Sequence, residues 1–129
     1  MYKINHDISK RIVYVKLSGF IQLPEMIEYG TELTSTLDKI PYKVFLLVDA
    51  LENKVMPQDS IEELNKIRER NKTNLLKSAV VLNNPLLEKQ TERTYKKVNM
   101  EWEEQYFNTI MDAESWLFSF KNLKWLKNA

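Results

Sequence analysis

A continuous apolar run at positions 44–48 constrains the fold more than any other feature of this sequence. Valine, phenylalanine and leucine follow one another there, with no polar residue before Asp49. A strand that is apolar at every position is buried on both faces, which is typical of a parallel sheet covered by helices. The run therefore predicts a central strand of an α/β domain.

Strand-like and helix-like segments alternate around this run. Tyr2 with Ile4 and residues 12–17 are rich in β-branched and aromatic residues, and we expect them to pair across the polar stretch 5–11. Apolar residues then recur at helical spacing from Pro24 to Ile40, and Pro41 ends that pattern. A loop at 50–58, a helix from 59, a strand at 78–82, a helix from 84, a strand at 105–107 and a helix from 112 follow.

This order, β-β-α-β-α-β-α-β-α, predicts one α/β domain with a five-stranded, mixed and mostly parallel sheet flanked by about four helices. We place the domain at residues 1–118 and a basic amphipathic extension of the last helix at 119–129. Two helix starts carry capping residues: either Asp59 or Ser60 for one helix, and Asn84 followed by Pro85 for the next.

Composition excludes several classes of function. The 129 residues carry a net charge of +1 with both signs interspersed, which argues against nucleic acid as a partner. The absence of cysteine excludes thiol catalysis and cysteine-based metal sites, and two glycines cannot build a glycine-rich phosphate loop. Residues 1–10 lack the apolar core of a signal peptide, and no apolar run approaches the ~20 residues of a transmembrane segment, so we expect a soluble, cytoplasmic protein.

Two residues were weighed for catalysis. His6, the single histidine, falls in the polar connection after the first strand, where we interpret it as exposed and uncommitted. Asp49 ends a buried strand, a position at which α/β folds place ligand-binding and catalytic groups, so a phosphate acceptor or a Mg²⁺ ligand is one reading. We favour a carboxylate that fixes the turn or pairs with a basic side chain. No metal site and no cofactor are predicted.

Several of these features together resemble a known family. They are the strand that ends at Gly19, the helix opening at Pro24-Glu25, the buried strand at 44–49, and the closing pattern of Phe107, Ala113, Trp116 and Leu117. With this element order they resemble the small bacterial STAS-like proteins related to SpoIIAA. The resemblance implies a five-stranded mixed sheet with helices, and a protein that binds partner proteins, nucleotides or apolar ligands without catalysing a reaction.

The same resemblance directs attention to the start of the helix after the third strand. The anti-sigma-factor antagonists of that family are phosphorylated there on a serine of an Asp-Ser-Ser-Gly-like motif. Asp59 and Ser60 match its first half, whereas Ile61 and Glu62 replace the second serine and the glycine. We therefore favour simple helix capping, and keep Asp49, Asp59, Ser60 and Ile61 as candidates for ligand or partner binding.

Two aromatic segments have alternative readings. Tyr95, Trp102 and Tyr106 would line an apolar ligand pocket or serve the core, and we favour the core. The final helix carries an apolar stripe flanked by Lys121, Lys124 and Lys127, which suits docking on its own core, a membrane surface or a partner. The candidates for a subunit contact are Leu123, Trp125 and Leu126.

The sequence therefore predicts a non-catalytic STAS-like binding or regulatory module that acts through protein–protein interaction or self-association. The alternative is a small carrier or sensor of an apolar or anionic ligand, either lipid-like or a nucleotide, that uses the loop after Asp49 and the following helix start. A hydrolase or phosphotransferase that uses Asp49 is the third hypothesis.

Overall fold

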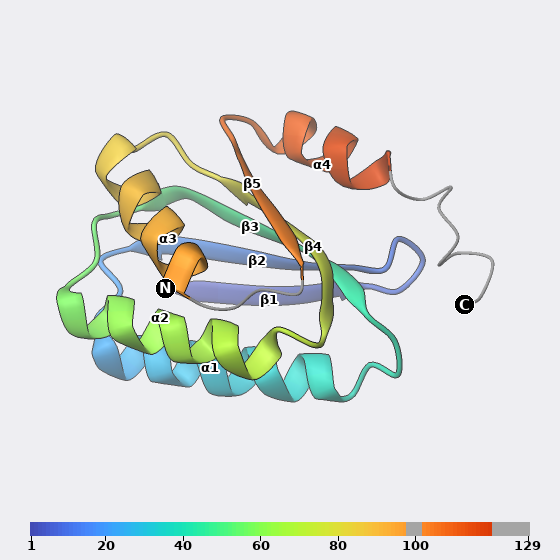
Figure 1. Cartoon of the computed structure of the whole chain (residues 1–129), viewed down its shortest axis with the longest axis horizontal. Coiled ribbons are helices and arrows are strands. Elements are labelled where there is room, and N and C mark those ends of the chain that lie inside the picture. Colours follow the sequence, from blue (N-terminus) through green and yellow to red (C-terminus); the bar gives the residue numbers. More distant parts are fainter. Residues whose placement is uncertain (98–101, 120–129) are drawn as a thin grey trace.

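A computed structural model describes residues 1–97 and 102–119 of the chain. It contains a sheet in which the strands lie in sequence order, β1-β2-β3-β4-β5, with β1 antiparallel to β2 and all later neighbours parallel (Figure 1). The elements are β1 (Tyr2–Asp7), β2 (Ile12–Gly19), α1 (Leu23–Asp38), β3 (Val44–Asn53), α2 (Gln58–Asn71), β4 (Leu75–Val81), α3 (Pro85–Lys97), β5 (Glu103–Phe107) and α4 (Ile110–Phe118). The predicted order of elements and the mixed, mostly parallel sheet are confirmed.

The sequential strand order decides where the helices lie. Each connection from β2 to β5 moves one strand further in the same direction, and right-handed crossovers then place all three connecting helices on one face. Helix α4 follows the last strand of the sheet and is not part of a crossover between strands. It packs on the opposite face against β3, β4 and β5 (Figure 1). The sheet is therefore covered by α1, α2 and α3 on one side and by α4 on the other.

Strand β3 is buried on both faces, as its apolar run predicts. Val44, Leu46 and Val48 belong to the core beneath α1, α2 and α3. Phe45 and Leu47 belong to the smaller core beneath α4, together with Ala113 and Leu117 of that helix.

The first hairpin differs from the prediction. Strand β1 continues through His6, which pairs with Val13, so His6 is a half-buried strand residue and not part of an exposed connection. The turn itself is formed by residues 8–11, and Arg11 adopts a positive φ of 54°. The Asp7 carboxylate accepts hydrogen bonds from the Ser9 hydroxyl at 2.8 Å and from Lys10 N at 3.1 Å, which lowers the Asp7 pKa.

The helix starts were predicted with mixed success. Asn84 Oδ1 accepts from the backbone N–H groups of Leu86 at 3.0 Å and Leu87 at 3.2 Å, which confirms it as a cap. Helix α2 begins one residue before Asp59, with Pro57 at the N-cap and no capping side chain, so the prediction of Asp59 or Ser60 as cap was wrong. Helix α4 begins at Ile110, two residues earlier than expected, because Thr109 is the residue that caps it.

The extension predicted at 119–129 falls almost wholly on residues 120–129, which lie outside the described part of the chain, and it stays a prediction. Within the described residues, no helix combines the length and the apolar character that a bilayer span requires.

Candidate functional site

One end of the sheet holds most of the residues singled out from the sequence. The parallel strands finish there, and the helices that follow them begin there (Figure 1). The half-buried Asp49 lies inside β3, which continues to Asn53, so the predicted end of the strand at Asp49 and the predicted loop from residue 50 were wrong. Its carboxylate accepts a hydrogen bond from the backbone N–H of Leu51, two residues further along the same strand, at 3.2 Å, and it fixes no turn. Asp49 also faces Lys16 across the β2–β3 pair. The Lys16 Nζ lies 2.9 Å from the Glu52 carboxylate.

The start of α2 presents only one of its three candidates to solvent. Asp59 is exposed, whereas Ser60 and Ile61 are buried. The Ser60 hydroxyl is fully buried and donates to the carbonyl oxygen of Ile21 at 3.0 Å, which ties α2 to the connection between β2 and α1. In this conformation the Ser60 hydroxyl is therefore a structural group, and a binding role for the three residues stays a prediction.

Several exposed apolar side chains occur at the same end of the sheet. Among the described residues, the large hydrophobic side chains that remain exposed are Met1, Ile8, Phe20, Ile27, Leu51, Leu86 and Met111. Of these, Met1, Phe20, Leu51, Leu86 and Met111 lie in strand ends, connections or first helical turns at the carboxyl end of the parallel strands, and Ile27 lies in the second turn of α1. Met111 belongs to α4, on the opposite face of the sheet from α1 and α3. Phe20, which follows the positive-φ Gly19, is 54% exposed. Sequence reasoning missed this group because most of its members stand next to another apolar residue that is buried, as Phe20 does beside Ile21 and Leu86 beside Leu87.

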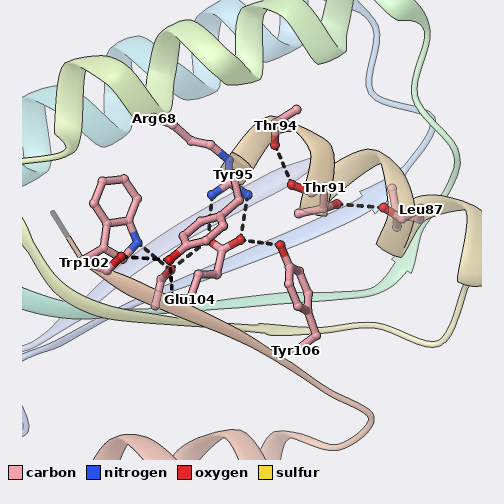
Figure 2. Close-up of polar contacts among 9 residues, drawn as sticks. Arg68, Leu87, Thr91, Thr94, Tyr95, Trp102, Glu104 and Tyr106 are labelled. Atoms are coloured by element: carbon pink, nitrogen blue, oxygen red, sulfur yellow. Dashed lines mark hydrogen bonds and ion pairs between the residues drawn. The ribbon is translucent and has the colours of Figure 1, made fainter. Parts of the chain in front are cut away.

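The interior contains a polar cluster that sequence reasoning also missed. Arg68 of α2 and Glu104 of β5 form a two-pronged ion pair, with Nη1–Oε1 at 2.7 Å and Nη2–Oε2 at 3.0 Å (Figure 2). Their side chains are only 9% and 3% exposed. Burial disfavours the charged guanidinium, but the adjacent Glu104 carboxylate outweighs this and raises the pKa of Arg68.

Further donors complete the shell around Glu104. The carboxylate also accepts from the Ser78 hydroxyl at 2.8 Å and from the Tyr106 hydroxyl at 2.6 Å. Burial, followed by the charge of Glu104, raises the pKa of Tyr106. Trp102 Nε1 donates to Ser78 Oγ at 2.8 Å, and the Tyr95 hydroxyl donates to the Trp102 carbonyl at 3.0 Å (Figure 2). Tyr95 and Trp102 thus contact each other beside the Arg68–Glu104 pair, and Tyr106 binds Glu104 of the same cluster.

A cavity of about 60 Å³ lies between this cluster and the core beneath α1, α2 and α3. Its lining is mostly aliphatic side chains from α1, α2, β2, β3 and β4, and Arg68, Thr91, Trp102 and Glu104 also contribute. Of the predicted pocket residues, Trp102 lines the cavity, whereas Tyr95 and Tyr106 bind the polar cluster beside it.

The remaining candidates are not brought together. His6 lies near Thr36 and Ile40, far along β1 from the end described above, and its Nε2 is buried without a hydrogen-bond partner. Within residues 1–97 and 102–119, no three acidic or histidine side chains are grouped to hold a metal ion. Leu123, Trp125 and Leu126 lie outside the described residues.

Comparison with known proteins rests on structure alone. No family model and no curated protein matches the sequence. A protein of the DUF3478 family with a SpoIIAA-like fold from Shewanella loihica PV-4 is similar, with 18% identity, a TM-score of 0.70, and 91% of this chain and 92% of that chain covered. An anti-sigma factor antagonist from Mycobacterium paratuberculosis is similar at 16% identity and a TM-score of 0.61, with coverage of 92% and 95%. The likeness spans nearly the whole of each chain, and together with the strand order it shows that this protein has the SpoIIAA-like fold.

Proposed function

We propose that this protein is a cytoplasmic, non-catalytic regulatory module that acts by binding another protein through the carboxyl end of its parallel strands. The observation that carries the proposal is that exposed apolar side chains, among them Phe20 and Leu51, occur at that end of the sheet. Aromatic residues such as Phe20 are enriched where proteins associate.

The fold supports the same class of function. A protein with this fold is named as an anti-sigma factor antagonist, and that name describes action on a protein. Two polar residues at this end bind other parts of the protein: Asp49 accepts from the backbone of Leu51 in the same strand, and Ser60 ties α2 to the connection before α1. Recognition at this end would therefore rest on the exposed apolar side chains and on Asp59, which is exposed beside them at the start of α2.

The test compares matched surface variants. Phe20→Ser with Leu51→Ser removes two exposed apolar side chains at the proposed surface, whereas Ile8→Ser removes one that is 71% exposed in the hairpin at the opposite end. Tagged forms would be used to capture proteins from extracts of the source cells, with quantitative mass spectrometry, after equal thermal stability of the variants has been checked.

We expect a protein that is retained by the wild type and by Ile8→Ser and lost from the double variant. Equal capture by all three forms, or no specific partner for any of them, would contradict the proposal. A shift from dimer to monomer in the double variant by light scattering, without a partner, would assign the surface to self-association instead.

A further inference from the structure

Strand β1 leaves one edge of the sheet open (Figure 1). It pairs with β2 along its whole length without a shift in register, and no other strand of the described residues lies on its outer side. Proline and β-bulges, which commonly block an edge strand, are both absent from β1. Such an edge is able to accept a strand from another chain.

The hydrogen bonds to β2 show which backbone groups of β1 point outward. Met1 and Ser18 exchange two backbone hydrogen bonds, both of 2.8 Å. Bonded positions alternate with non-bonded ones in an antiparallel pair, so the N–H and C=O groups of Tyr2, Ile4 and His6 point away from β2. No backbone hydrogen bond from another element of residues 1–97 and 102–119 reaches these groups.

The Tyr2 end of this edge is acidic on the side of α1. The Tyr2 hydroxyl donates to Glu28 Oε1 at 3.2 Å, and Glu25 and Glu32 line the same hollow. Glu25 is paired with the amino group of Met1 at 2.7 Å, whereas Glu28 and Glu32 are exposed. The carboxylates of Glu28 and Glu32 therefore leave negative charge at this end.

The His6 end of the edge is basic on the same side. His6 lines a hollow with Thr36 and Lys39, and Lys39 is exposed. The neighbouring Asp38 is turned toward Asn74, whose amide donates to its carboxylate at 3.2 Å. Within the described part of the chain, His6 Nε2 is buried without a hydrogen-bond partner, which is uncommon for a buried polar atom.

We propose that two copies of this chain pair through β1 in antiparallel orientation, with Ile4 opposite Ile4 on a twofold axis. This register makes hydrogen-bonded pairs of the residues whose backbone groups point outward, with Tyr2 of one copy opposite His6 of the other. The acidic end of each edge then lies beside the basic end of the other, so the interface is self-complementary. Lys3 lies opposite Asn5 of the second copy, and no two lysines face each other.

This interface is separate from the proposed protein-binding surface. The paired edge contains neither Phe20 nor Leu51, which follow β2 and lie in β3. Pairing through β1 joins the two sheets into one and leaves those side chains exposed, so either proposal can fail without the other.

Amide hydrogen exchange followed by NMR tests the pairing directly. In a single copy the N–H groups of Ile4 and His6 face solvent, whereas those of Lys3 and Asn5 bond to β2. We expect Ile4 and His6 to become protected as the protein concentration rises, in step with the dimer fraction measured by sedimentation velocity. Lys3 and Asn5 should be protected at every concentration.

Charge reversal tests the register. Glu28→Lys and Lys39→Glu change exposed side chains, and each creates two like-charge contacts in the dimer, so each should weaken dimerisation roughly tenfold or more at low salt. The double variant restores opposite charges and should recover wild-type affinity, as should an equimolar mixture of the two single variants. Lys89→Glu is the control, because it makes the same change of charge on α3, which connects β4 and β5, and it should have no effect.

The outcomes are distinguishable. A chain that stays monomeric at every concentration reached would overturn the proposal, and so would a dimer without new protection at Ile4 and His6. Charge reversals that do not weaken the dimer, or whose effects are not recovered in the double variant and in the mixture, would rule out the antiparallel register proposed.

Discussion

Replacing Glu104 by glutamine is the sharpest test of how the interior is held together. The change keeps the shape of the side chain and removes its charge, while four donor atoms are arranged around it: two from Arg68, one from Ser78 and one from Tyr106. An amide nitrogen would then face a donor, and the buried guanidinium would lose its counter-charge. Breaking a buried ion pair by removing one partner costs about 3–5 kcal/mol.

The neighbouring residue provides the control. Glu103 also pairs with a basic side chain, at 2.7 Å from Lys77 Nζ, but its side chain is 47% exposed. An exposed pair contributes about 0–1 kcal/mol, so Glu103→Gln should change stability little. Urea unfolding followed by circular dichroism would measure both free energies. For a domain whose total stability is typically about 5–15 kcal/mol, the loss at position 104 should move the midpoint markedly.

A double replacement separates charge from packing. Arg68→Met with Glu104→Gln removes both charges, and the glutamine oxygen can still accept from either Ser78 or Tyr106, which donate to different oxygens of the Glu104 carboxylate. We expect the double variant to be less destabilised than the sum of the two single variants by about 1–3 kcal/mol. Two results would refute the reasoning. Either Glu104→Gln costs no more stability than Glu103→Gln, or the effects of Arg68→Met and Glu104→Gln simply add, which would mean that the two charges do not stabilise the interior as a coupled pair.

Three further predictions concern packing, capping and pH. A Cβ on Gly30 would lie 2.5 Å from Ile67 Cγ1, so Gly30→Ala should destabilise the contact of α1 with α2 by about 1–3 kcal/mol in urea unfolding. Gly19→Ala, whose Cβ meets nothing within 4 Å, should cost about 1–2 kcal/mol through its φ of 73° alone. An unchanged unfolding midpoint in Gly30→Ala would contradict the packing argument. Asn84→Ala should cost about 1 kcal/mol through the lost α3 cap, whereas an unchanged unfolding midpoint would count against the cap. Burial and Glu114 raise the pKa of Tyr14 from 10.0 to about 12, so its contribution to stability is complete below about pH 10 and is lost as the pH rises to about 12. Unfolding measured across that window should show a smaller alkaline loss in Tyr14→Phe, and an equal loss would refute the assignment.

The fold was predictable where a short segment decides the structure. The apolar run at 44–48 identified a strand buried on both faces, and Asn84-Pro85 identified the start of α3. The start of α2 was not predictable in this way. Ser60 lies within the first turn, and its hydroxyl bonds to Ile21, 39 residues earlier, so its role depends on how two distant segments pack.

The ion pair shows what a pattern of single residues can and cannot give. Arg68 stands seven residues after Ile61 and four after Leu64, which places it on the apolar stripe of α2, and Glu104 stands between Trp102 and Tyr106 on one face of β5. Arg68 and Glu104 are therefore charged residues at positions where the helical or strand period predicts a core residue. Burying either alone would be costly, so two such positions of opposite sign indicate a buried pair. The sequence offers other charges as partners, and only the packing of α2 beside the end of β5 selects Glu104 for Arg68.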